Sequence, residues 1–259
     1  MNVVRPKKNL GQHFLKDRNI AFKIVDSLGA NVSDVLEIGP GMGILTGYLM
    51  QRKDIRLYVV EVDPEAVRFL NNSFPELTPR LFNKDFLKWD LKPLPGRFCI
   101  IGNFPYNISS QIFFRLLALR NRVPEVVGMV QKEVADRLAA GPGSKTYGIL
   151  SVLLQAWYEV DSLFSVPPGV FVPPPKVKSA VIRLKRNATG TLPCNEQLFF
   201  EVVKTAFNQR RKMLRNSLSG RNLQLPEYFA PKRPEQLTVA DFIELTNSIE
   251  NLTNGRSWK

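Results

Sequence analysis

The segment GNFPYN, residues 102–107, places an amide, aromatic rings and a proline directly after an apolar run that predicts a buried strand. Such a set suits a planar ring that carries an amine, because acceptors can take up the amine hydrogens while an aromatic side chain stacks on the ring face. The side-chain oxygen of Asn103 and the backbone oxygen of Pro105 are suitable acceptors, and Tyr106 is the stacking ring. These three residues are the first candidates for a catalytic site.

The chemistry that this set favours is methyl transfer to the exocyclic N6 amine of adenine. That nitrogen is a poor nucleophile because its lone pair is delocalised into the ring, and acceptors of its hydrogens localise the pair. A sulfonium donor has a good leaving group, so the rate depends mainly on holding the amine about 3 Å from the methyl carbon. The stretch VFVPPP predicts a rigid loop that offers Phe171 as a second stacking partner, although such an aromatic is commonly a packed loop residue.

A glycine-rich turn predicts the site of a nucleotide-like cofactor. The string VLEIGPGMGILT runs from a predicted strand through Gly39, Gly41 and Gly43 into a helix, and glycines there allow a tight turn and close approach of a ligand. Glu61 ends the next predicted strand about twenty residues later, where α/β folds place a carboxylate that accepts from ribose hydroxyls. Asp85 in NKDFL is placed to accept from an adenine amine. Because the carboxyl ends of parallel strands meet at one edge, we expect these residues near GNFPY.

The glycine spacing distinguishes between two cofactors, a nicotinamide dinucleotide and S-adenosylmethionine. A dinucleotide fingerprint needs GxGxxG to seat a pyrophosphate at the helix start, and GPGMGILTG does not keep that register. A cofactor without phosphate tolerates the change, so we predict S-adenosylmethionine. No sequence feature demands a metal, and Cys99 and Cys194 are expected to be free thiols.

The formal net charge of +13 favours a polyanionic partner, and nucleic acid is the first candidate. Basic residues cluster at the amino terminus, at Arg5, Lys7, Lys8, Lys16 and Arg18. A second cluster lies in and just after a helix predicted over residues 197–218, at Lys204, Arg210, Arg211, Lys212, Arg215 and Arg221. Apolar residues recur on another side of that helix, so we expect one face to pack and one to bind nucleic-acid phosphates, with a merely solvated face as the alternative.

The elements that must position these residues follow a βα pattern from about residue 33 to residue 138, which predicts a parallel sheet in an α/β fold. We predict strands at 34–38, 56–62, 80–83, 98–103 and 126–131, with a later one at 177–185. Between the last two, VPPGVFVPPP excludes a helix or a central strand. A linker after Arg186 and a helical pattern to the end predict a catalytic domain over 1–186 and a small helical domain over 187–259, which would bind nucleic acid through the second basic cluster.

No apolar run reaches the roughly 20 residues that a membrane span needs, and the amino terminus has no apolar core of the signal-peptide kind. We therefore expect a cytoplasmic protein with no membrane partner.

Several segments, in order and over nearly the whole chain, resemble the KsgA-type ribosomal RNA adenine dimethyltransferases. They are KKNLGQHFL, EIGPGMGILT, VVEVDP, GNFPYNISSQI, MVQKEVADRLAAGPGSKTYGILSV, FVPPPKVKSAV and FNQRRKMLRNSL. The resemblance implies a class I, Rossmann-like methyltransferase fold with a seven-stranded, mostly parallel sheet and a small C-terminal helical domain. It also implies dimethylation of N6 on two adjacent adenosines in the 3′-terminal hairpin loop of small-subunit rRNA. The substrate would be an immature 30S particle, the reaction would be coupled to its maturation, and the enzyme would act as a monomer.

Carried over by motif, the resemblance implies a cofactor site and a target pocket. The cofactor contacts would be His13, Leu15, Gly39, Gly41, Glu61, Asp85 and Asn103. The target pocket would be Asn103, Pro105, Tyr106 and Phe171. This chain departs from the family in GQHFL, where GQNFL is commoner, and in GNFPY, where GNLPY is commoner. The first departure affects His13, the only histidine of the chain.

Three alternatives share part of this pattern. An Erm-type dimethyltransferase of large-subunit rRNA would use the same pocket, but GPGSKTYGILSV and FNQRRKMLRNSL favour the small subunit. DNA N6-adenine methylation would explain NFPY, yet no DNA-recognition module is found. A non-enzymatic ribosome-assembly factor could retain the fold, but intact Glu61, Asp85, Asn103 and Tyr106 argue against a loss of catalysis.

Overall fold

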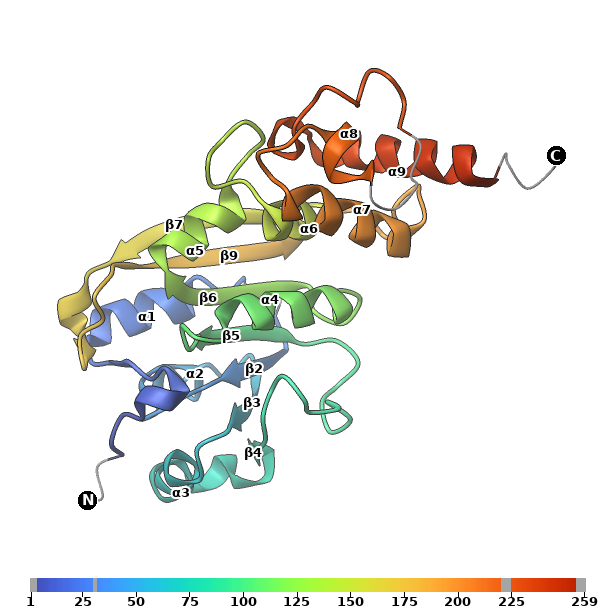
Figure 1. The fold of residues 1–259 in the computed structure, drawn as a ribbon. Helices are drawn as coiled ribbons and strands as arrows, with labels where there is room; N and C mark the ends of the chain where they lie inside the picture. The colour runs from blue at the N-terminus through green and yellow to red at the C-terminus, as the bar shows by residue number, and fades with distance from the viewer. Residues whose placement is uncertain (1–3, 30–31, 220–224, 255–259) are drawn as a thin grey trace. The chain divides into compact units, whose positions relative to one another are not determined.

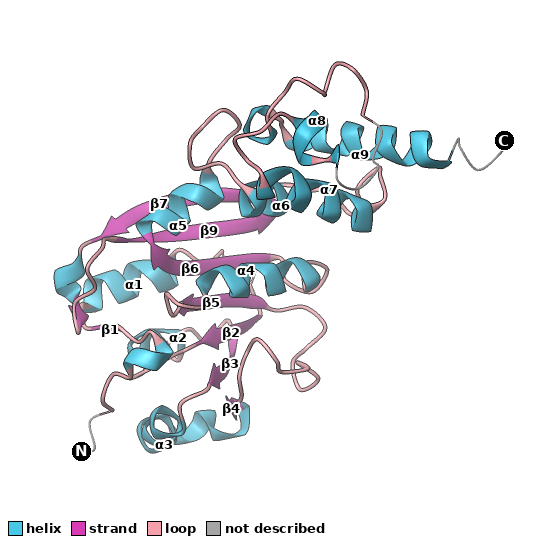
Figure 2. Cartoon of the chain, in the orientation of Figure 1, coloured by secondary structure: helices cyan, strands magenta, loops and turns pink. Residues whose placement is uncertain are grey.

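This computed structural model describes residues 4–29, 32–219 and 225–254, and the larger of its two sheets has seven strands. The strand order is β4-β3-β2-β5-β6-β9-β7 (Figures 1 and 2). The strands are β2 (Asp34–Ile38), β3 (Arg56–Glu61), β4 (Leu81–Asn83), β5 (Cys99–Asn103), β6 (Glu125–Gln131), β7 (Tyr158–Val166) and β9 (Ser179–Arg186). Neighbours from β4 to β6 pair in parallel, and β9 pairs antiparallel with β6. The predicted α/β fold with a mostly parallel sheet is confirmed.

Helices connect most of these strands. They are α1 (Arg18–Asp26), α2 (Ile44–Leu49), α3 (Pro64–Ser73), α4 (Ser109–Ala118), α5 (Lys132–Ala139), α6 (Ile149–Gln155), α7 (Glu196–Asn208), α8 (Leu214–Ser217) and α9 (Val239–Asn254). Two begin at aspartate caps: Asp17 accepts from the backbone of α1, and Asp63 accepts from Glu65 N of α3 at 2.9 Å. None of the helices in the described ranges has the length and hydropathy of a membrane span.

The predicted strands lie where expected, within two residues at each end, but β7 was not predicted. Its sequence, YEVDSLFSV, carries polar residues at most of its exposed positions, because β7 is the edge strand of the sheet. The adjacent apolar residues Leu163 and Phe164 interrupt the alternation of apolar and polar residues by which strands are recognised. The predicted loop VPPGVFVPPP also contains short elements, a 3-10 helix at Pro168–Val170 and the two-residue strand β8 (Phe171–Val172).

Strand β8 forms a separate small sheet with β1 (Phe14–Leu15) near the amino terminus. The two strands are antiparallel, with Leu15 opposite Phe171 and Phe14 opposite Val172. Lys16 N extends the pairing by donating to Val170 O at 2.9 Å. The amino-terminal segment is thereby attached to the proline-rich segment, which is distant in sequence.

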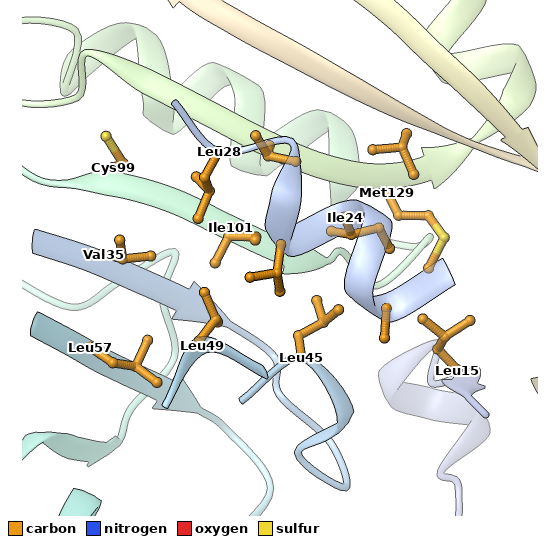
Figure 3. Close-up of a cluster of buried hydrophobic side chains, with 14 of the residues drawn as sticks. Leu15, Ile24, Leu28, Val35, Leu45, Leu49, Leu57, Cys99, Ile101 and Met129 are labelled. Atoms are coloured by element: carbon orange, nitrogen blue, oxygen red, sulfur yellow. The ribbon is translucent and has the colours of Figure 1, made fainter. Parts of the chain in front are cut away.

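The main apolar core lies between the sheet and helices α1 and α2 (Figure 3). Ile24 of α1, Leu28 just after that helix, and Leu45 and Leu49 of α2 are buried. They pack with side chains from alternate positions of the strands, including Val35, Leu57, Cys99, Ile101 and Met129. Because successive strand residues point to opposite faces, these positions define one face of the sheet. The core fixes the strands whose carboxyl ends carry the candidate site residues.

The chain divides into two compact units, and the division differs from the predicted domains. Unit 1 comprises Met1–Ala135 and Val160–Arg186, and unit 2 comprises Asp136–Glu159 and Asn187–Lys259. A boundary between the two units falls after Arg186, as in the predicted domains. The segment 136–159, however, belongs to unit 2. Within that unit α6 packs against α7 and α9, and Gly143 N donates to Glu235 O at 2.6 Å. These contacts, which link segments distant in sequence, leave no signature in local composition.

The single helix predicted over residues 197–218 is wrong. Helix α7 ends at Asn208, a turn follows, and α8 begins at Leu214. The backbone nitrogens of Leu214 and Arg215 donate instead to Lys232 O at 2.8 Å and Ala230 O at 3.1 Å. Hydrogen bonds to a later loop therefore replace the helical ones. The turn contains neither glycine nor proline, so the sequence carried no break signal.

Candidate functional site

The glycine turn between β2 and α2 requires glycine for a steric reason. Gly41 has a φ of 56°, and a Cβ there would lie 2.8 Å from the ring of Phe14. A side chain at this position would meet both backbone strain and a clash. The turn therefore presents bare backbone beside the amino-terminal segment.

Glu61, at the end of β3, is held against this turn. Only 4% of the residue is exposed, and its two carboxylate oxygens accept from Gly41 N at 3.3 Å and from Asp63 N at 2.9 Å. Burial raises the pKa of Glu61, while the backbone donors act in the opposite direction. The carboxylate is thus fixed on the wall of the adjacent pocket.

One pocket gathers most of the predicted site residues at the carboxyl ends of β2, β3, β4 and β5. Its lining includes His13, Gly39, Gly41, Glu61, Asp85, Asn103, Pro105 and Tyr106. The apolar Val62 and Phe86 also line it and were not predicted, because an apolar residue shortly after a strand has no distinctive signal. Asp85 uses one carboxylate oxygen to accept from Leu87 N at 2.9 Å. The convergence expected from the strand order is therefore observed.

Leu15 and Phe171 lie elsewhere. Both side chains are buried in the apolar core, where they oppose each other in the β1–β8 pair. Leu15 borders a smaller pocket beside the glycine turn, whereas the ring of Phe171 is 1% exposed and belongs to neither pocket. The ring that stacks on Tyr106 is that of His13, with centroids 5.1 Å apart and planes 29° from parallel. The predicted placement of Phe171 in the target pocket is therefore not observed in this structure.

The amide of Asn103 is oriented by the amino-terminal segment. Its Nδ2 donates to the backbone oxygen of His13 at 2.8 Å. Because this bond occupies the donating end of the amide, Oδ1 is the group left to accept a hydrogen bond from a ligand. His13 in turn is held by a hydrogen bond of 2.8 Å from its Nδ1 to Pro173 O. Since a carbonyl can only accept, this bond places the proton on Nδ1.

The second predicted acceptor, the backbone oxygen of Pro105, already accepts from Ile108 N at 3.2 Å in a turn. The neighbouring residue Phe104 also lines the pocket, and its carbonyl accepts no backbone hydrogen bond in the described part of the chain. Phe104 is therefore the better backbone acceptor beside Asn103. The sequence could not identify it, because every residue carries a carbonyl and only the local turn decides which one is engaged.

Tyr106 is anchored through its hydroxyl, which lies 2.5 Å from the hydroxyl of Ser179 at the start of β9. Burial raises the pKa of Tyr106, so the phenol stays neutral near pH 7. With one end hydrogen-bonded and one face covered by His13, the ring has a defined orientation. Ser179 was not predicted, because a serine within a strand is unremarkable by itself.

Ser179→Ala is expected to lower kcat about three- to tenfold, because a neutral hydrogen bond that orients a side chain contributes about 1 kcal/mol. Initial rates of methyl transfer at saturating cofactor would measure the effect. Tyr106→Phe removes the same bond from the other side, so the double variant should be no slower than the slower single variant. Losses that simply multiply would contradict a shared contact.

Glu37, in the middle of β2, is a buried acid that sequence reasoning missed. It is 1% exposed, and Thr46 Oγ1 donates to its Oε2 at 2.7 Å, while its Oε1 has no hydrogen-bond partner among the described residues. Burial raises its pKa to about 8. The side chain borders the smaller pocket beside Gly39 and Gly41. An acid within the apolar run VLEI was the signal that could have identified it.

Glu37→Gln is expected to flatten the pH dependence of stability. A carboxyl with a pKa near 4.5 unfolded and about 8 folded stabilises the fold below pH 4.5, and this contribution is lost as the pH rises to about 8. Its slope approaches about 1.4 kcal/mol per pH unit, which the glutamine variant lacks. Urea unfolding of both cofactor-free proteins from about pH 5 to about pH 9 would measure the difference. Parallel curves would contradict the raised pKa.

The predicted RNA-binding residues lie in unit 2 and differ in their surroundings. Arg211, Lys212 and Arg215 are exposed on the turn and on α8, and Lys204 is exposed on α7. Arg210 instead donates to the backbone oxygens of Ser144 at 3.0 Å and Lys145 at 2.5 Å, so it holds a loop of the same unit. Arg221 lies outside the described residues.

Cys99 is buried and Cys194 is half-buried, and both are free thiols as predicted. Within residues 4–29, 32–219 and 225–254, no cluster of three histidine, cysteine or acidic side chains is placed to hold a metal ion.

The family model described as "Ribosomal RNA adenine dimethylase" matches residues 3–251. A curated relative from Parabacteroides distasonis, named "Ribosomal RNA small subunit methyltransferase A", is 59% identical over 254 residues, covering 95% of this chain and 94% of the relative. A dimethyladenosine transferase from Plasmodium falciparum has a similar structure, with a TM-score of 0.75, 25% identity and coverage of 94% and 98% of the two chains. The 23S rRNA methyltransferase ErmE gives a TM-score of 0.68, 26% identity and coverage of 90% and 99%.

Proposed function

We propose that this chain, which belongs to the ribosomal RNA adenine dimethylase family, methylates the N6 amines of adenosines in small-subunit rRNA. The protein is a methyltransferase with the class I fold, and S-adenosylmethionine is its methyl donor. The observation that carries the proposal is the orientation of Asn103. Its amide offers an accepting oxygen at the end of β5, in the same pocket as Glu61 and Asp85.

The residues of the pocket fit S-adenosylmethionine group by group. Glu61 is a fixed acceptor for ribose hydroxyls, and Asp85 can accept from the adenine amine between Val62 and Phe86. Glu37, with an unpartnered oxygen beside the glycine turn, suits the cationic amine of the methionine part. When bound, this cofactor supplies an electrophilic methyl group and a neutral leaving group.

In the target half of the pocket, Asn103 Oδ1 and the Phe104 carbonyl would accept the two N6 hydrogens, and Tyr106 would stack on the base. Accepting both hydrogens directs the nitrogen lone pair toward the methyl carbon, and the proton leaves after attack. Pro105 would contribute through the turn that shapes this strand end rather than as the main acceptor. Phe171 could stack on a base only if its ring left the core.

The finer features of the substrate are also part of the proposal. The target would be two adjacent adenosines in the 3′-terminal hairpin loop, each dimethylated, in an immature 30S particle in the cytoplasm, with the enzyme acting as a monomer. Curated relatives that align with this chain over nearly their full length are named "Ribosomal RNA small subunit methyltransferase A". That name supports the small subunit as substrate. Lys204, Arg211, Lys212 and Arg215 would bind RNA phosphates and so position the particle without reading its sequence.

The proposal is tested by a comparison of substrates. Labelled methyl from S-adenosylmethionine should enter undermethylated small-subunit particles as N6,N6-dimethyladenosine, located by digestion and mass spectrometry. Transfer to naked large-subunit rRNA instead would indicate an Erm-type activity. This alternative is included because the structure is similar to that of the 23S rRNA methyltransferase ErmE. Binding to particles without any transfer would select an assembly factor and contradict the proposal.

A further inference from the structure

A second, wider hollow adjoins the catalytic pocket within unit 1. It is a groove of about 900 Å³ that shares Gly11, Gln12, His13 and Tyr106 with that pocket. Because His13 and Tyr106 stack on each other and line both cavities, their rings form the partition between them. The far wall of the groove is the proline-rich segment from Val172 to Val177. The groove contains none of Glu61, Asp85 and Asn103, but through Tyr106 it lies directly beside the proposed site of the target base.

The charged groups of the groove are all positive. Lys8 and Lys176 are exposed on its lining, and no carboxylate belongs to that lining. Neither lysine takes part in a salt bridge within the described part of the chain. Two unneutralised ammonium groups on one groove favour a ligand with phosphates.

The uncharged surface of the groove is largely apolar, and its proline-rich wall is conformationally restricted. Val172 and Val177 are 50% and 46% exposed, and Pro173 and Pro174 between them are also exposed. The prolines restrict the backbone, and His13 Nδ1 holds the segment at Pro173 O. Gln131, at the end of β6, adds a side chain that can donate and accept hydrogen bonds. A positively charged groove that also presents ring and apolar surface, here from His13, Tyr106 and the valine and proline wall, is suited to a single-stranded nucleotide.

We propose that this groove binds the RNA nucleotide next to the adenosine being methylated. The assignment rests on the proposed function, since it presumes an RNA target in the adjoining pocket. Consecutive nucleotides are joined by one phosphate, so the neighbour of the target adenosine must bind directly beside the target pocket. The groove adjoins that pocket and shares lining residues with it. Lys8 and Lys176 bind the phosphates on either side of that neighbour, and its base rests on the valine and proline wall.

The lysine contacts are tested in the full-length protein with Lys8→Gln/Lys176→Gln. The matched control is Lys23→Gln/Lys53→Gln, which removes the same charge from exposed sites outside both cavities. We expect the KM for undermethylated small-subunit particles to rise roughly tenfold in the first variant only. The slope of log affinity against log salt should become shallower by about 1.4, because each lost phosphate contact on a single strand removes about 0.7. Equal effects in both variants, or none in either, would overturn the proposal.

The position of the bound nucleotide is tested by a photo-crosslinking amino acid in place of Val177. Irradiation with the particle should crosslink the nucleotide immediately beside the methylated adenosine, as read by reverse-transcription stops. Crosslinks confined to other nucleotides or to a ribosomal protein would overturn the assignment. Failure of the proposed function is distinguishable, because the unmodified protein would then transfer no methyl to particles. If the unmodified protein transfers methyl normally and the Lys8→Gln/Lys176→Gln variant behaves like it, only the assignment of the groove is overturned.

Discussion

Asn103→Ala is expected to reduce methyl transfer to small-subunit particles by about a hundred- to a thousandfold, the usual loss when one preorganised polar contact to a transition state is removed. The amide is fixed by its bond to the His13 backbone, so in the proposed role its oxygen would meet the target amine without reorganisation. Alanine provides no acceptor and also leaves the His13 carbonyl without its donor. The main loss should lie in kcat, because an acceptor that strengthens as the nitrogen becomes cationic acts mostly in the transition state.

Single-turnover rates and calorimetric titration with S-adenosylmethionine would separate the two effects. The affinity for cofactor should fall no more than a few fold, since Glu61 and Asp85 remain. The matched control is Asn107→Ala, the same substitution four positions later, where the side chain donates only to Asn9 O at 3.4 Å and lines neither pocket. Unchanged transfer in Asn103→Ala, or an equal loss in Asn107→Ala, would contradict the assigned role.

Glu61→Gln is expected to weaken the binding of S-adenosylmethionine about a hundredfold. Hydrogen bonds to a charged acceptor contribute about 1.5 to 3 kcal/mol each, and a ribose diol offers two of them. Glutamine keeps the shape and one acceptor but loses the charge and the second acceptor. Of the two backbone donors that Glu61 holds, at Gly41 and Asp63, one would also lose its partner.

Calorimetry at fixed pH would measure the loss, with Glu65→Gln as the control, because Glu65 is an exposed acid on α3 whose partner is Lys7. Burial raises the pKa of Glu61, so protonation should weaken cofactor binding at a higher pH than an ordinary glutamate would allow. The glutamine variant should lack this dependence. Thermal unfolding of the cofactor-free variants would separate lost binding from lost stability, and a similar affinity in wild type and Glu61→Gln would contradict the role in ribose binding.

The sheet and the glycine turn were predictable because their signals are local. The central strand β5 begins as an apolar run, and β2 is apolar apart from Asp34 and Glu37. The polar or glycine residues of the pocket stand at or directly after the ends of both strands. The order of strand ends in an α/β fold then brings Glu61, Asp85 and Asn103 together without further information.

Features that depend on contacts distant in sequence were not predictable. An aromatic before prolines looks the same whether it faces a pocket or the core, and only the pairing of Phe171 with Leu15 decides. The asparagine-to-histidine departure at position 13 was visible, but its stacking on Tyr106 depends on a bond to Pro173. Helix α7 ends early for the same reason, since its continuation is bonded to residues near 230.

The interleaving of the two units in the chain has a consequence for synthesis. Residues 136–159 leave the ribosome before β9, although they belong to unit 2 and β9 completes the sheet of unit 1. Their buried side chains, among them Leu153 and Trp157, belong with helices made still later, because α6 packs against α7 and α9. Neither unit can therefore complete its fold during translation before part of the other has emerged. A nascent chain that stops after Arg186 would expose the apolar side chains of residues 136–159, and a chaperone would bind them.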